Sequence, residues 1–110
     1  MRVEMPIHTV SLLNKREPWQ VTARRKRLQR EMVRRQLANL KPPALPVAVN
    51  LTRISAGRLD THDNLPSAFK HVVDALAQWL GVDDSDPRVT WSYDQGKGQR
   101  GTHFIVVEIV

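Results

Sequence analysis

The sequence contains no cysteine and only five glycines, and aromatic residues make up just 5% of the chain. Without cysteine, the chain can form neither a disulfide framework nor a thiolate zinc site. Its apolar stretches are each a few residues long, which is too short for a transmembrane helix. The first residues also lack the apolar core of a secretory signal. We therefore expect no membrane partner and a cytoplasmic location, where the reducing environment suits a cysteine-free chain.

The 110 residues are enough for one small domain, residues 1–110, with a modest hydrophobic core. The charge is unevenly distributed along it. Residues 1–58 contain thirteen Lys or Arg and three Asp or Glu, whereas residues 59–110 contain four and eight, respectively. The resulting net charges of +10 and −4 predict a first half suited to polyanions and a second half able to hold cations.

Hydrophobic periodicity and helix-breaking residues predict the order β-α-β-α-β-β. Four segments have the composition or the period-two alternation of strands, and they span residues 3–13, 47–52, 89–93 and 103–110. Helices are predicted from Trp19 to Leu40 and from Asn64 to Leu80, and Gly81 is the expected C-cap of the second. We expect an α/β (α+β) domain with helices packed on a small mixed sheet, and a flexible loop over Gln95–Gly101.

The first predicted helix is rich in arginine. At 100° per residue, most guanidinium groups fall on one side of the helix and most apolar side chains on the other. The basic side contains Arg24, Arg27, Arg30, Arg34 and Arg35, and the apolar side contains Val21, Leu28, Met32, Val33, Leu37 and Leu40. Guanidinium groups match phosphate oxygens, so the basic side predicts DNA binding that is sensitive to salt and blind to sequence.

The DNA-binding residues that we expect are Arg24, Arg27, Arg30 and Arg34 on this helix, together with Lys97 and Arg100 in the later loop. The simpler alternatives are a solvated basic face for the helix and an ordinary surface hairpin for the loop.

Acidic residues gather on both sides of the second predicted helix. Asp60 and Asp63 precede it, and Asp83, Asp84 and Asp86 follow it. Lys70 and Asp74 lie on the helix itself, on the same side as Asp63 and away from the apolar stripe. Carboxylates without cysteine suit Mg²⁺, or Mn²⁺ in its place, and such ions polarise a phosphodiester.

Each acidic group also has a purely structural interpretation. Asp63 could be a helix N-cap. Asp83, Asp84 and Asp86 could be turn residues. Asp74 and Lys70 could be a surface ion pair.

In their order, several segments resemble the RusA-type Holliday-junction resolvases, especially small phage and prophage members. The segments are Leu59–Leu65 (LDTHDNL), Phe69-Lys70, Asp74–Leu76 (DAL) and Leu80–Asp84 (LGVDD). The resemblance covers residues 47–110 well and the basic helix more loosely. It implies a homodimeric, Mg²⁺-dependent endonuclease of DNA recombination and repair, which makes paired cuts in four-way DNA junctions.

The resemblance also implies residue roles. Asp63 matches the second aspartate of the family's Asp-x-Asp-Asn-Leu motif, and Asp84 matches the catalytic aspartate of the acidic turn. Lys70 matches the helix lysine, and Asn64 matches the motif asparagine. Thr61 occupies the place of the first motif aspartate, so the expected substitute is Asp60, with a bulge in the loop, and His62 is the alternative. The expected catalytic set is Asp60, Asp63, Lys70 and Asp84, and the expected metal ligands are Asp60, Asp63, Asp83 and Asp84.

Two other classes of function stay open from the residues alone. One is a non-catalytic nucleic-acid-binding module that uses the arginine-rich helix. The other is an interaction protein whose basic helix docks on an acidic partner.

Overall fold

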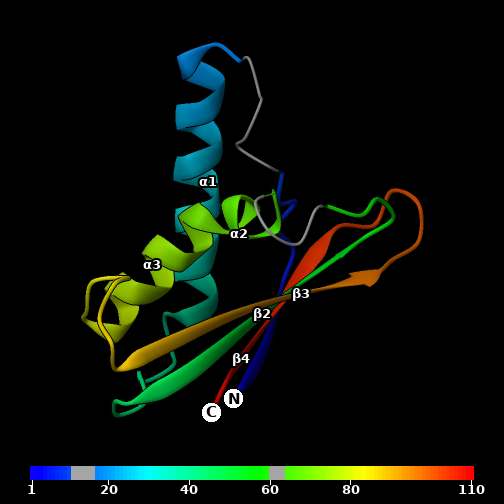
Figure 1. Cartoon of the computed structure of the whole chain (residues 1–110). Helices are drawn as coiled ribbons and strands as arrows, with labels where there is room; N and C mark the ends of the chain where they lie inside the picture. Colours follow the sequence, from blue (N-terminus) through cyan, green and yellow to red (C-terminus); the bar gives the residue numbers. More distant parts are fainter. Residues whose placement is uncertain (11–16, 60–63) are drawn as a thin grey trace.

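The computed structural model describes residues 1–10, 17–59 and 64–110. Within these residues the chain forms a four-stranded mixed sheet and three helices, which confirms the predicted fold class and order of elements. The strands are β1 (Arg2–Met5), β2 (Val47–Ser55), β3 (Val89–Lys97) and β4 (Phe104–Ile109). The helices are α1 (Trp19–Leu37), α2 (Asn64–Ala68) and α3 (Lys70–Leu80), and all three lie on one side of the sheet (Figure 1).

The strands are arranged in the order β1-β4-β2-β3. β4 is antiparallel to both β1 and β2, whereas β2 and β3 are parallel, with Ser55 opposite Lys97 at their ends. Parallel strands require a crossover connection, and α2 and α3 supply it. The carboxyl ends of β2 and β3 therefore lie at the same edge of the sheet.

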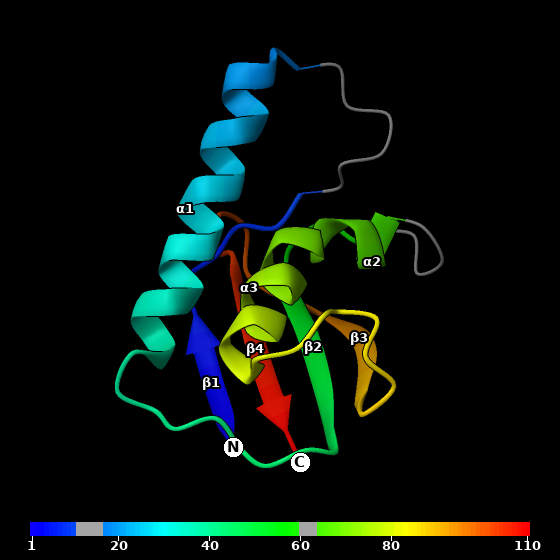
Figure 2. The ribbon, with the colours of Figure 1, turned by 90° about the vertical axis from the view of Figure 1, so that its left-hand side faces the viewer.

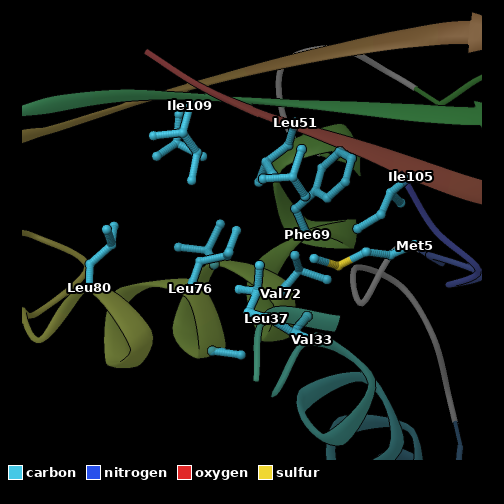
Figure 3. Packing of buried hydrophobic residues seen from close by; sticks show 14 of the residues in the cluster. Met5, Val33, Leu37, Leu51, Phe69, Val72, Leu76, Leu80, Ile105 and Ile109 are labelled. Atoms are coloured by element: carbon cyan, nitrogen blue, oxygen red, sulfur yellow. The ribbon is translucent and has the colours of Figure 1, made fainter. Parts of the chain in front are cut away.

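The hydrophobic core lies between the sheet and the helices. Alternate residues of β2 are buried against the helices, as the period-two pattern predicts. Leu51 and Ile105 from the sheet meet Phe69 and Leu76 from the helical layer (Figure 3). Gly81 ends α3 in the left-handed conformation with φ 79°, which confirms the predicted C-cap.

The helix predicted from Asn64 to Leu80 is in fact two helices, α2 and α3, separated at Phe69. The Phe69 N–H donates to the Pro66 carbonyl at 3.1 Å, a tighter turn than that of an α-helix. The Phe69 ring is fully buried and stacks on Tyr93 with ring centroids 5.8 Å apart. Burial of this ring accompanies the break, which hydrophobic spacing alone did not reveal.

The predicted apolar side of α1 is correct only in the second half of the helix. Val33 and Leu37 are buried, but Val21 and Leu28 are 44% and 50% exposed, and Gln29 is buried in their place. Figure 2 shows the reason: the first half of α1 projects beyond the sheet and α3. The helix also ends at Leu37 rather than at Leu40.

All four strands differ in their bounds from the prediction: β2 continues to Ser55, and β4 spans Phe104–Ile109. The other two differences are larger. β1 spans only Arg2–Met5, because Pro6 has no N–H to donate to a ladder. β3 continues through Lys97, so the first part of the predicted flexible loop is paired strand. The two glycines there allow close packing: a Cβ on Gly96 would lie 2.8 Å from the Ile54 side chain, and one on Gly98 would lie 3.0 Å from it. Among the described residues no helix has the length and apolarity needed to cross a membrane.

His71 on α3 makes the stability of the domain sensitive to pH. It is buried, and neither of its ring nitrogens has a hydrogen-bond partner within the described part of the chain. Burial is the main cause that lowers its pKa below the ordinary 6.5. The nearby cations Lys26, Arg30 and Lys70 lower the pKa further, and Asp74 opposes them.

In the unfolded chain His71 therefore binds a proton near pH 6.5, whereas in the folded domain it does so only at lower pH. The contribution of His71 to the free energy of unfolding is therefore fully present above about pH 6.5 and is lost as the pH falls below it. We expect the thermal midpoint of the wild type to fall more between about pH 7 and about pH 5 than that of a His71→Leu variant. Thermal unfolding followed by circular dichroism measures this difference. Parallel pH profiles for the two proteins would contradict it.

Candidate nucleic-acid and metal site

The basic face of α1 is largely free to meet a polyanion. Arg24, Arg27 and Arg34 are exposed, and a surface hollow of about 630 Å³ runs between side chains of residues 23–35. Two other arginines already have carboxylate partners: Arg25 binds Glu17 at 2.7 and 2.9 Å, and Arg35 binds Glu31 at 3.0 Å. The free guanidinium groups of this face are suited to phosphate contacts.

Arg30 connects the basic face to the acidic residues. Its guanidinium lies 3.4 Å from the Asp74 carboxylate, which also lies 3.9 Å from Lys70 Nζ. Arg30 lines the hollow on α1 and also a second hollow of about 340 Å³, which Asp74, Asp83 and Asp84 share. The two hollows therefore adjoin one another at Arg30.

Asp83 and Asp84 face one another in the turn after α3. A hydrogen bond between their side chains is the largest cause that raises the pKa of Asp84, and partial desolvation and the charges of Asp83 and Asp74 add to it. Lys70 lowers the same pKa, so its ammonium group lies within electrostatic range. The pKa of Asp83 is lowered, mainly by hydrogen bonds within the turn. Two carboxyl groups this close repel one another when both ionise, and a divalent cation would relieve that repulsion.

The turn itself explains part of this acidic cluster. Asp83 Oδ1 accepts hydrogen bonds from the Ser85 N–H and hydroxyl, as expected of a turn residue. Asp86 is held by the Arg88 backbone and guanidinium, which lower its pKa to about 2. Asp84 is oriented instead through its carbonyl oxygen, which accepts a 3.0 Å hydrogen bond from Trp91 Nε1.

The donor chemistry of Asp74, Asp83 and Asp84 fits a hard cation such as Mg²⁺, which prefers a few carboxylate oxygens together with water. Within residues 1–10, 17–59 and 64–110, no three acidic or histidine side chains converge closely enough to complete a metal site. The predicted ligands Asp60 and Asp63, together with Thr61, lie outside the described residues.

The other predicted DNA contacts lie at the opposite end of β3. Lys97 is the last residue of this strand and Arg100 lies in the turn that follows, and both are exposed. They are separate from the acidic hollow near the start of the strand, so the structure divides the predicted site residues into two areas.

Three residues near Asp84 were not among the predicted site residues. Asp74 contributes to the same hollow, Trp91 holds the Asp84 backbone, and Tyr93 lies close enough for the Asp84 charge to raise its pKa, after burial as the main cause. A sequence signal existed for Asp74, which falls on the same side of the predicted helix as Lys70, and for Trp91 and Tyr93 only in their place in a predicted strand. No family model matches the chain, and neither does any curated protein, so the RusA-type resemblance stays a prediction from the motifs.

Proposed function

We propose that this protein is a Mg²⁺-dependent, structure-specific endonuclease that resolves four-way DNA junctions by paired phosphodiester cuts. The observation that carries the proposal is that Asp74, Asp83 and Asp84 line one hollow together with Arg30 of the basic helix. In this arrangement one wall binds the phosphate backbone and the other holds a cation.

The roles of the chain's own residues follow from their positions. Exposed arginines of α1 bind and orient the DNA backbone through salt-sensitive phosphate contacts. Asp84, with Asp63 and Asp60 from the preceding segment, would hold Mg²⁺, which would polarise the scissile phosphodiester. Lys70 would stabilise the charge that develops on the phosphate. A two-fold homodimer would present two such sites to a two-fold junction, which accounts for paired cuts.

The test is cleavage of a labelled synthetic four-way junction beside a linear duplex of the same sequence, with Mg²⁺ and with EDTA. We expect paired cuts in the junction alone and only with the divalent ion. Tight binding without cutting in Mg²⁺ or Mn²⁺ would overturn the enzymatic proposal.

Charge reversal on α1 tests how the DNA is held. We expect the double variant Arg27→Glu, Arg34→Glu to bind all DNAs more weakly. The slope of log K against log salt concentration should become shallower by about 2, because two phosphate contacts are lost. Fluorescence anisotropy between about 50 and 200 mM salt measures the slope. The matched control, Arg2→Glu with Lys41→Glu, makes the same charge change away from α1 and should keep most of the slope. Equal slopes in all three proteins would mean that α1 faces another partner.

A non-catalytic nucleic-acid-binding module is the second candidate. The observation that favours it is the number of acidic side chains already held within the fold: Asp83 and Asp86 by their own turn, and Asp74 by Arg30 and Lys70. Divalent-ion-independent binding of DNA or RNA, without cleavage, is the result expected of such a module.

A further inference from the structure

The carboxyl ends of the parallel strands β2 and β3 enclose a small hollow that includes Lys97, one of the predicted DNA contacts. It measures about 280 Å³ and is lined by residues 55–58 and 95–97. Figure 1 shows the two chain segments side by side beyond the sheet, and the Gly98 N–H donates to the Ser55 carbonyl at 3.0 Å. In sheets with parallel strands, the carboxyl ends are the usual place for ligands.

The charged residues that line this hollow are both basic. Arg58 and Lys97 line it, both are exposed, and neither has an ion-pair partner within the described part of the chain. Arg53 is only 6% exposed, and its guanidinium donates to the carbonyl oxygens of Thr9 and of the lining residue Gly57. None of the residues that line the hollow is acidic. Cations that face a hollow with no carboxylate of its own favour an anionic ligand.

The backbone on both sides of Arg58 is fixed. The Gly57 carbonyl accepts a 2.6 Å hydrogen bond from Arg53 Nη1. The Gln95 side chain binds both polar groups of the Leu59 backbone: it accepts from the N–H at 2.9 Å and donates to the carbonyl at 2.7 Å. Arg58 therefore projects from a clamped segment rather than from a free loop, which reduces the entropy lost when its guanidinium binds a ligand.

We infer that this hollow, with Arg58 and Lys97 as its cationic walls, is a seat for one backbone phosphate of DNA, separate from any phosphate beside Asp84. The inference rests on the proposed function, because it places a second DNA contact in the same protein. Gln95 is a positioning residue that acts through the Leu59 backbone.

The strand geometry sets how far this seat lies from the acidic hollow. Trp91, Tyr93 and Lys97 lie on the same face of β3, and Asp84 contacts Trp91 at the start of the strand. At about 3.3 Å per residue, Lys97 lies about 13–20 Å from Tyr93 and Trp91. This distance corresponds to about four to six base steps along a duplex, given about 3.4 Å per step on each strand. The seated phosphate would thus lie about four to six base steps from a phosphate beside Asp84.

Single substitutions test the seat by salt dependence on a four-way junction and on a linear duplex. We expect Arg58→Ala and Lys97→Ala each to weaken binding several-fold and together to lower the salt slope by about 1, since one phosphate contact is lost. Lys41→Ala makes the same charge change at an exposed residue away from the hollow, and its slope should match the wild type. Gln95→Leu changes no charge, and we expect it to weaken binding without changing the thermal midpoint by more than a few degrees.

The outcomes separate this inference from the proposed function. If the charge reversals on α1 lower the slope but the Arg58 and Lys97 variants do not, the seat is wrong and DNA binding stands. If the wild type binds no DNA, both are wrong. Titration with inorganic phosphate, followed by NMR of the Gly57, Arg58 and Lys97 amides, distinguishes a free-phosphate site. If phosphate saturates these amide shifts but the Arg58 and Lys97 variants bind DNA like the wild type, the assignment to DNA is overturned.

Discussion

Replacement of Asp84 by asparagine should reduce Mg²⁺-dependent cleavage of a four-way junction by more than about 100-fold. Loss of a residue that only hydrogen-bonds a metal ligand already reduces activity about 10–100-fold, and Asp84 is expected to be a ligand itself. Asparagine keeps the shape of the side chain but removes the charge that attracts the cation. DNA binding should stay close to wild type, because the phosphate contacts come from α1 and from the ends of β2 and β3. Single-turnover cleavage and anisotropy on the same junction measure the two effects separately.

The control for this variant lies in the same turn. Asp86 is already bound by the Arg88 backbone and guanidinium and does not line the acidic hollow, so Asp86→Asn should cleave at nearly the wild-type rate. Asp63→Asn tests the motif aspartate outside the described residues, and we expect it also to abolish cutting while binding is kept. Full activity of both Asp84→Asn and Asp63→Asn would remove the metal-site assignment.

Truncation of Phe69 should have the largest effect on stability. The side chain is 0% exposed, lies between α2 and α3, and stacks on Tyr93 of β3. Phe69→Ala leaves a cavity that these elements cannot fill, so we expect a loss of about 3–5 kcal/mol in the free energy of unfolding. A domain of this size has a small total stability, so Phe69→Leu, with an expected loss of about 1–2 kcal/mol, provides a variant that stays folded.

Phe104 gives the matched comparison, because it is the only other phenylalanine and is half-buried on the side of the sheet away from the helices. Urea unfolding of Phe104→Ala should show a clearly smaller loss than that of Phe69→Ala, since less apolar surface is exposed to water. An equal loss would contradict the position of the core between the sheet and the helices.

Patterns of a few consecutive residues predicted correctly those elements whose structure depends on neighbours in the sequence. The alternation of Val47, Val49 and Leu51 predicted a strand with one buried face, and Gly81 predicted the end of a helix. Both succeed because side-chain period and a left-handed C-cap are properties of a few consecutive residues. Val21 and Leu28 on α1 misled the same reasoning, because whether an apolar side chain is buried depends on what lies opposite, and there the helix extends past its partners.

Some features of the candidate site could likewise be predicted from the sequence, and others depend on the tertiary structure. The sequence by itself determined the small mixed domain, the arginine-rich helix and the separation of basic and acidic halves, because composition and periodicity record these directly. Only the tertiary structure decided that Arg30 pairs with Asp74, that Asp84 lies against Trp91, and that Arg58 and Lys97 share a hollow. These pairs are far apart in the chain or come from different elements. Their contacts depend on helix packing and on the parallel register of β2 and β3, which no local pattern encodes.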